Sequence, residues 1–157
     1  MKEFTHFDEA GNAHMVDVSA KEDTVRTAIA RGSIRVSPEV LHAIKWGTVK
    51  KGDVLTVAQV AGIQAVKKNA HLIPMCHPIP LTHTALTFDT DERASVITAF
   101  CEVKTIGKTG AEMEALTGVS VALLTIYDMC KAIDQRMVIG EIHLLEKHGG
   151  ASGDFVF

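Results

Sequence analysis

Residues 82–133 decide the fold, and they read THTALTFDTDERASVITAFCEVKTIGKTGAEMEALTGVSVALLTIYDMCKAI. Apolar and polar residues alternate over 82–90 and again over 95–106, which predicts two strands of an antiparallel hairpin. The pattern then changes to a long apolar run, so we expect a helix over about 111–133. Because this helix is apolar almost all round, it is expected to be buried on most sides.

The chain before the hairpin supplies one strand and two helices. Alternation over 24–36 predicts the strand. A serine N-cap followed by proline predicts a helix over 37–47, and an aspartate cap predicts a second helix over 53–69. Three prolines then keep residues 72–81 extended, because proline is incompatible with a regular helix interior.

The last predicted element is a strand over 137–145. The order therefore matches the split βαββαβ pattern of a ferredoxin-like α+β fold, an antiparallel sheet with helices on one face. We expect a single domain over 1–157, with a flexible arm over 1–20 and a flexible glycine-containing tail over 148–157. Residues 96–103 are apolar on both sides of their strand, so the open face of the sheet is expected to pack against another subunit.

Composition excludes several classes of protein. The chain has 157 residues, is 46% hydrophobic and carries a net charge of −3, without the basic excess of a nucleic-acid binder. The sequence has no run of 18 apolar residues, so no membrane span is predicted. The acidic N-terminus is unlike a signal peptide. Three cysteines without a C-x-x-C pair are typical of reduced thiols in a cytoplasmic protein.

The loop before the long helix has two interpretations. Residues 107–110, GKTG, resemble the end of a phosphate-binding loop, but Glu102 stands where that loop requires glycine. Backbone N–H groups at a helix N-terminus can still face an anion, and the alternative is a plain capped turn. Thr109 and Glu112 have the spacing of a capping box, which predicts the start of the helix.

The long helix carries four candidate charged residues. Asp128 and Lys131 stand three residues apart, so they share one face and can pair. The pair is either a surface ion pair of little energetic value or a desolvated pair suited to proton transfer. Glu112 and Glu114 lie in the first turn, where acids most often serve as partners of the helix dipole.

The proline-rich segment carries a second candidate group. His77 is held in rigid backbone and could contact a phosphate or exchange a proton. A metal site with His71, Cys76 and His83 is the alternative, but the spacing matches no standard zinc pattern, so we predict no metal. Met75 and Cys76 could also be simple core residues. A small polyanion needs only a few converging cations from the set Arg26, Lys50, Lys51, Lys67, Lys68, Lys108, Lys131 and Lys147.

Several segments together resemble one family. They are KKGDV (50–54), AGIQAVKK (61–68), LIPMCHP (72–78) and the GKTGAEMEAL to YDMCKA stretch (107–132). They are similar to the molybdenum cofactor biosynthesis protein C family, the cyclic pyranopterin monophosphate synthases. The resemblance runs from about Met15 to Phe155 and covers nearly the whole chain.

The resemblance implies a reaction, an assembly and a set of site residues. The family converts 3′,8-cyclo-7,8-dihydroguanosine 5′-triphosphate, made by an upstream radical cyclase, into cyclic pyranopterin monophosphate, and acts as a lyase that releases diphosphate. Its members form homohexamers, trimers of dimers, with active sites between subunits. No cofactor is implied, and magnesium bound to the triphosphate stays open. The implied catalytic residues are Asp128, Lys131, Lys51 and His77; the implied substrate contacts are Met75, Cys76, His77, Glu112, Met113, Glu114, Arg26, Lys147 and Gly110.

Within that set, Asp128 is expected to be the principal general acid and base, tuned by Lys131 or by Lys51 of a neighbouring chain. The tail departs from the family pattern, because Ala151 stands where a lysine is usual. Three other functions remain as alternatives: a non-catalytic purine-nucleotide sensor, a metal-dependent hydrolase and an inert oligomeric scaffold. Neither nucleic acid nor a membrane is an expected partner.

Overall fold

The computed structural model describes residues 6–8 and 10–157. Positions 1–5 and 9 of the expected N-terminal arm lie outside the described residues. The element order is β1 (Thr24–Arg35), α1 (Pro38–Lys45), α2 (Val54–Leu72), β2 (Leu81–Asp91), β3 (Val96–Gly107), α3 (Glu112–Cys130), β4 (Val138–His148) and β5 (Phe155–Val156).

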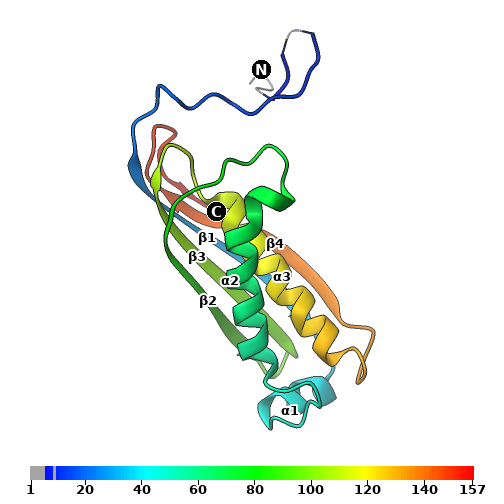
Figure 1. The fold of residues 1–157 in the computed structure, drawn as a ribbon. Coiled ribbons are helices and arrows are strands. Elements are labelled where there is room, and N and C mark those ends of the chain that lie inside the picture. Colours follow the sequence, from blue (N-terminus) through cyan, green and yellow to red (C-terminus); the bar gives the residue numbers. More distant parts are fainter. Residues whose placement is uncertain (1–5, 9) are drawn as a thin grey trace.

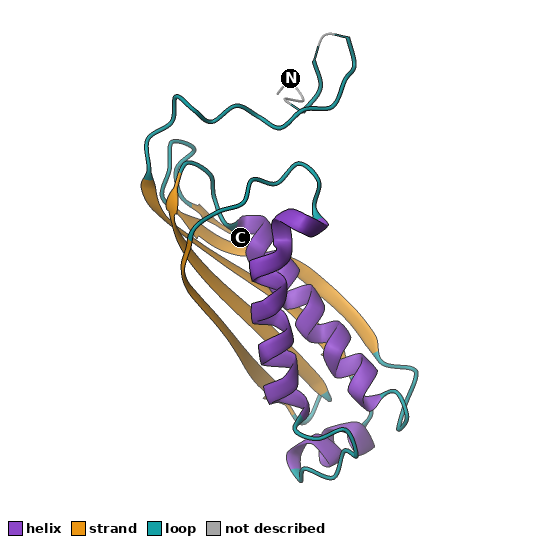
Figure 2. Ribbon diagram, in the orientation of Figure 1, coloured by secondary structure: helices purple, strands orange, loops and turns teal. Residues whose placement is uncertain are grey.

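The strands form one antiparallel sheet in the order β2-β3-β1-β4-β5. Helices α2 and α3 lie side by side across one face of this sheet, and α1 closes its lower end (Figures 1 and 2). The predicted α+β, ferredoxin-like arrangement is therefore confirmed. The described residues that precede β1 extend away from the sheet (Figure 1).

The two-residue alternation of β3 places one row of side chains in the core. Ile97, Ala99, Cys101 and Val103 are all fully buried under the helices. Their neighbours in the chain point to the open face, where Phe100 stays partly exposed. One face of β3 is therefore buried and the other faces the open side of the sheet, as the alternation in the sequence predicts.

Helix α3 begins differently from the prediction. Its N-cap is Ala111, with no capping hydrogen bond from a side chain, so the predicted capping box from Thr109 is wrong. The Glu112 carboxyl folds back over Gly110, into space that a Cβ atom would occupy. Glu112 then pairs with Lys147 instead of with the backbone of Thr109.

Other boundaries move by a few residues. Helix α2 continues to Leu72, past the lysines where the sequence pattern fades, and α3 ends at Cys130. Strand β4 continues to His148 because Lys147 and His148 pair with β1. Within the expected tail, β5 pairs with β4, which the sequence does not predict.

Among the described helices, α3 is long and apolar enough to cross a membrane by length and composition. Core helices of globular proteins pass the same test, and here α3 packs against the sheet and α2 (Figure 2). Its apolar character is therefore accounted for by the core.

Candidate functional site

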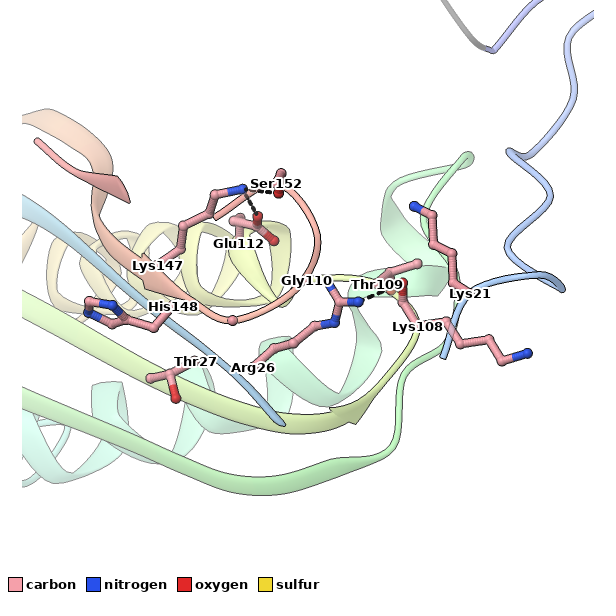
Figure 3. Close-up of a pocket in the computed structure, with 11 residues that line it drawn as sticks. Lys21, Arg26, Thr27, Lys108, Thr109, Gly110, Glu112, Lys147, His148 and Ser152 are labelled. Atoms are coloured by element: carbon pink, nitrogen blue, oxygen red, sulfur yellow. Dashed lines mark hydrogen bonds and ion pairs between the residues drawn. The ribbon is translucent and has the colours of Figure 1, made fainter. Parts of the chain in front are cut away.

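A cavity of about 160 Å³ opens where β1, the end of β4 and the loop before α3 meet (Figure 3). The cavity is rich in cations, with Lys21, Arg26, Lys108 and Lys147 in its lining. A second cavity of about 200 Å³ shares Thr109, Gly110 and Glu112 with the first. We call the first cavity the basic pocket and the second the Cys76 pocket.

Arg26 is fixed in the basic pocket by backbone carbonyls. Its Nε donates to the Gly107 carbonyl at 2.9 Å and its Nη2 donates to the Lys108 carbonyl at 3.1 Å. The Gly149–Gly150 turn passes directly over Arg26, and a side chain at Gly150 would collide with the guanidinium. Both glycines have positive φ, so the turn requires residues without a Cβ. Arg26 is thus a fixed cation in the lining of the basic pocket.

Lys147 links the tail to the start of α3. Its ammonium lies 3.1 Å from the Glu112 carboxylate and donates to the Ser152 hydroxyl at 3.2 Å (Figure 3). Both side chains of the ion pair are partly buried. A bound anion would compete with Glu112 for Lys147, so these two residues respond together to occupancy of the pocket.

The Cys76 pocket is built from the proline-rich segment and the first turn of α3. Met75, Cys76 and His77 line it together with Met113 and Glu114. Burial raises the pKa of the Cys76 thiol, and the nearby Glu114 carboxylate adds to this effect. Cys76 is therefore a thiol at neutral pH, suited to packing against a ligand more than to nucleophilic attack.

Glu114 is buried, with 4% of its surface exposed. Its Oε1 accepts a 2.9 Å hydrogen bond from the side-chain amide of Asn69 on α2. Burial, opposed by this hydrogen bond, raises the pKa of the Glu114 carboxyl. The first-turn acids therefore differ: Glu112 forms an ion pair, whereas Glu114 is a buried hydrogen-bonded group and not simply a partner of the helix dipole.

The third group lies at the other end of α3. Asp128 binds the Lys131 ammonium at 2.7 Å through one carboxylate oxygen and the Lys51 ammonium at 2.8 Å through the other. Lys51 also donates to the Asp128 backbone carbonyl at 2.9 Å. The hydrogen bond from Lys131, followed by that from Lys51, lowers the pKa of Asp128 to about 2.

The spacing of Asp128 and Lys131 thus predicts their contact. About half of each side chain is exposed, so the pair is a surface ion pair in the single chain, not a desolvated one. On sequence grounds Lys51 is expected to come from a neighbouring chain, but here the chain's own Lys51 reaches Asp128. We refer to Lys51, Asp128 and Lys131 as the Asp128 cluster.

The predicted site residues therefore form two separate sets. Arg26, Met75, Cys76, His77, Gly110, Glu112, Met113, Glu114 and Lys147 all line the two adjoining pockets. The Asp128 cluster lies at the opposite end of α3, beside the loop that follows α1 (Figure 1). Asp128 follows Glu112 by 16 positions along α3, which corresponds to a rise of about 24 Å.

Of the other basic residues, some line the basic pocket and some are exposed away from both pockets. Lys108 joins the basic pocket, whereas Lys50, Lys67 and Lys68 are exposed and line neither pocket. Lys21 lines the basic pocket although no sequence motif singles it out. Among the described residues, no three His, Cys, Asp or Glu side chains are placed to hold a metal ion.

The fold and these pockets define a class: a small α+β protein with a basic pocket beside two carboxyl groups, of which Glu114 is buried. Comparison with known proteins places it more closely. Residues 15–150 match the model of the MoaC family. A cyclic pyranopterin monophosphate synthase of Roseiflexus sp. (strain RS-1) is 56% identical over 156 residues, covering 99% of each chain. One of Clostridium perfringens (strain 13 / Type A) is 57% identical over 153 residues, covering 98% of this chain and 97% of the relative. The chain belongs to the MoaC family.

Proposed function

We propose that this chain is a cyclic pyranopterin monophosphate synthase of molybdenum cofactor biosynthesis. It acts as a lyase on 3′,8-cyclo-7,8-dihydroguanosine 5′-triphosphate and releases diphosphate. The observation that carries the proposal is the basic pocket, because it adjoins a pocket with two carboxyl groups that can bind the N–H groups of a guanine-derived ring. Relatives that share more than half of this sequence carry the same name.

The triphosphate binds in the basic pocket. Arg26, already oriented by two backbone carbonyls, makes a charged contact without further ordering. Lys147 turns from Glu112 toward the phosphate, and Lys21 and Lys108 add positive charge from the pocket rim. Glu112, freed from Lys147, is then available to accept from the ring N–H groups beside Glu114.

The Asp128 cluster supplies the reactive cations. The rearrangement opens the imidazole ring of the guanine, rebuilds a six-membered ring and closes a cyclic phosphate. In the last step a ribose hydroxyl oxygen bonds to the α-phosphorus while the bond to the bridging oxygen breaks, and diphosphate leaves with that electron pair. Lys51 and Lys131 stabilise the developing negative charge, and His77 exchanges protons at the pocket.

Asp128 holds both lysines in the resting chain. With its pKa at about 2, it carries no proton to donate at neutral pH. Its proposed acid–base role therefore requires closure of the site, because loss of water around the carboxylate or departure of one lysine raises its pKa.

The complete site forms between copies of the chain. The two sets of residues lie too far apart within one chain to touch one small substrate. The open face of the sheet offers a contact surface, since Val25 and Ile106 lie opposite each other on neighbouring strands and are 65% and 50% exposed. We expect a cytoplasmic homohexamer, a trimer of dimers, that receives its substrate from the radical cyclase.

The test is turnover of the metal-stripped protein with its substrate, with pterin and diphosphate measured together. One diphosphate per pterin supports the synthase.

Lys131→Ala should reduce turnover at least tenfold if Lys131 stabilises the leaving group; full turnover would contradict that role. Lys45→Ala, which removes another exposed ion pair far from the pockets, is the matched control. Binding without release would instead identify a nucleotide sensor, and activity only with added magnesium would assign the metal to the triphosphate.

A further inference from the structure

A buried amide lies directly behind Glu114. Asn69 is 1% exposed, although it directly follows the exposed Lys67 and Lys68 on α2. Its Nδ2 donates to Glu114 Oε1 at 2.9 Å, and its Oδ1 accepts from the Thr117 hydroxyl at 2.7 Å. Three side chains from two helices therefore form one hydrogen-bonded chain that ends at the Cys76 pocket.

The direction of this chain is set by Glu114 and completed by Thr117. A side-chain amide can present either its N–H groups or its oxygen to a neighbour, but an ionised carboxylate only accepts. The N–H groups of Asn69 therefore face Glu114, and the Thr117 hydroxyl donates to the remaining Oδ1. An amide oxygen in that place would repel the Glu114 carboxylate and leave a buried acceptor without a donor, which is costly.

We propose that Asn69, held by Thr117, is a positioning residue that aims its N–H at Glu114 and fixes this carboxyl at the wall of the Cys76 pocket. The effect of Asn69 on catalysis rests on the proposed function. The contact itself does not depend on that function. Asn69 lines neither pocket itself; it acts on the Cys76 pocket through Glu114 and through the Cys76 thiol, whose pKa its side-chain hydrogen bond lowers.

The same hydrogen bond keeps Glu114 able to ionise while buried. Burial and the negative charge of Glu112 raise the Glu114 pKa, and the bond from Asn69 opposes them. The groups that face Glu114 from other elements are Asn69 on α2 and the Cys76 thiol of the proline-rich segment, and His77 lines the same pocket. Removing the Asn69 donor therefore raises the Glu114 pKa further.

The direct test is the Glu114 pKa, measured by NMR titration of ¹³C-labelled glutamate carboxyls. Asn69→Leu is nearly the same size but donates no hydrogen bond, and it should raise the Glu114 pKa. Asn69→Asp keeps the shape and replaces the donor by a second acid, so it should raise the pKa as well and serves if the leucine variant does not fold. Gln59→Leu is the matched control, since Gln59 lies on the same helix as Asn69 and its partly buried side-chain amide donates to the Leu86 carbonyl on β2.

The kinetic test separates positioning from a general loss of packing. Asn69→Leu should lower kcat/KM by about 10- to 100-fold, and it should move the acidic limb of the pH profile to higher pH. Thr117→Val should give a smaller effect in the same direction, and Thr117→Ser, which retains the hydroxyl, should behave as the parent chain. Thr125→Val is the control on α3, because that hydroxyl bonds only its own helix backbone.

An unchanged Glu114 pKa in both Asn69 variants would overturn the inference, as would an equal loss of kcat/KM in Gln59→Leu. If the parent chain has no synthase activity, the proposed function fails while the NMR titration still decides the role of Asn69.

Discussion

The Asp128 carboxylate is shared by two lysines, and this sharing determines its charge. Lys131 and Lys51 each occupy one oxygen, and both favour the ionised form. The folded pKa of about 2 lies below the ordinary value of 3.8, so Asp128 loses its favourable contacts only as the pH falls through that range. Throughout the neutral range it stays an anion that holds both lysines in place.

The lysines should respond when this anion is removed. Asp128 raises the pKa of Lys131 through its hydrogen bond and its charge. We expect Asp128→Asn to lower the Lys131 pKa, as measured by NMR titration of the labelled lysine side chain. Asp134→Asn, which removes a carboxylate that pairs with Arg136, should leave Lys131 unchanged. An equal response in the two variants would contradict a specific Asp128–Lys131 coupling.

Glu114 has the opposite dependence on pH. Its folded pKa is raised, so its protonated form is favoured by folding, and that contribution is lost as the pH rises through the folded pKa. Glu114→Gln mimics the protonated form and keeps the acceptor oxygen for Asn69. We expect the variant to gain stability relative to the parent chain as the pH rises from 4 to 8, by denaturant unfolding at each pH. A difference independent of pH would show that Glu114 has the same pKa in the folded and unfolded chains, which would contradict the raised pKa.

For single residues, sequence spacing predicts contacts between positions that are close in the chain, but it does not predict contacts between positions that are far apart in the chain. Asp128 and Lys131 are three residues apart on one helix, so their pairing follows from helical geometry. The contact of Lys51 with Asp128 spans 77 positions and depends on how the loop after α1 folds. Asn69 is missed because two lysines precede it where the apolar pattern fades, although its buried position continues the helical spacing.

At the scale of secondary-structure elements, two glycines allow helices α2 and α3 to pack closely. Gly62 on α2 and Gly118 on α3 face each other, and a Cβ at Gly118 would lie 2.7 Å from a methyl of Val66 and 2.8 Å from the Cys101 sulfur. Both distances are too short for ordinary packing, and each neighbour is buried. The close contact of α2 and α3 therefore requires the absence of side chains at these positions.

Gly118→Ala should consequently destabilise the fold. We expect a loss of about 1–3 kcal/mol in the free energy of unfolding, because an overpacked core must shift buried atoms. Gly140→Ala is the matched control in β4, where nothing lies within 4 Å of the added Cβ, and it should be close to neutral. Denaturant unfolding of the two variants measures the difference. A neutral Gly118→Ala would mean that the helices separate at little cost.

Patterning predicts the type of every main element, and tertiary contacts decide where each one ends. The alternation in β3 and the apolar run of α3 follow from residue periodicity alone. The start of α3 does not, because Glu112 pairs with Lys147, 35 positions away, in place of the capping partner nearby. The pairing of β5 with the end of β4 likewise depends on the tail folding back through its glycine turn.

At the scale of the whole molecule, the single chain presents two half-sites. The basic and Cys76 pockets lie at the N-terminal end of α3 and the Asp128 cluster lies at its C-terminal end (Figure 1). The family resemblance indicates residues of both sets, yet nothing in the sequence pattern shows that one long helix separates them. If one substrate uses both sets, each active site must take one half from each of two chains.

Mixing two inactive variants tests this arrangement. Asp128→Asn damages one half-site and Glu112→Gln damages the other, so each variant alone should have little activity. In a mixed dimer, one of the two sites combines an intact half from each chain, and the other combines both damaged halves. Random mixing makes about half of the dimers mixed, so the unseparated mixture should recover about a quarter of the parent activity and isolated mixed dimers about half.

The control for this experiment uses two lesions in the same half-site. Asp128→Asn mixed with Lys131→Ala leaves no intact Asp128 cluster in any dimer, so recovery is not expected. The subunits are exchanged by joint refolding, and the mixed species is isolated with two different affinity tags and assayed for pterin and diphosphate. Isolated mixed oligomers without activity would show that each chain works alone. Full activity of Asp128→Asn on its own would instead show that the Asp128 cluster takes no part in the chemistry, and that Lys51 and Lys131 only stabilise the surface at the C-terminal end of α3.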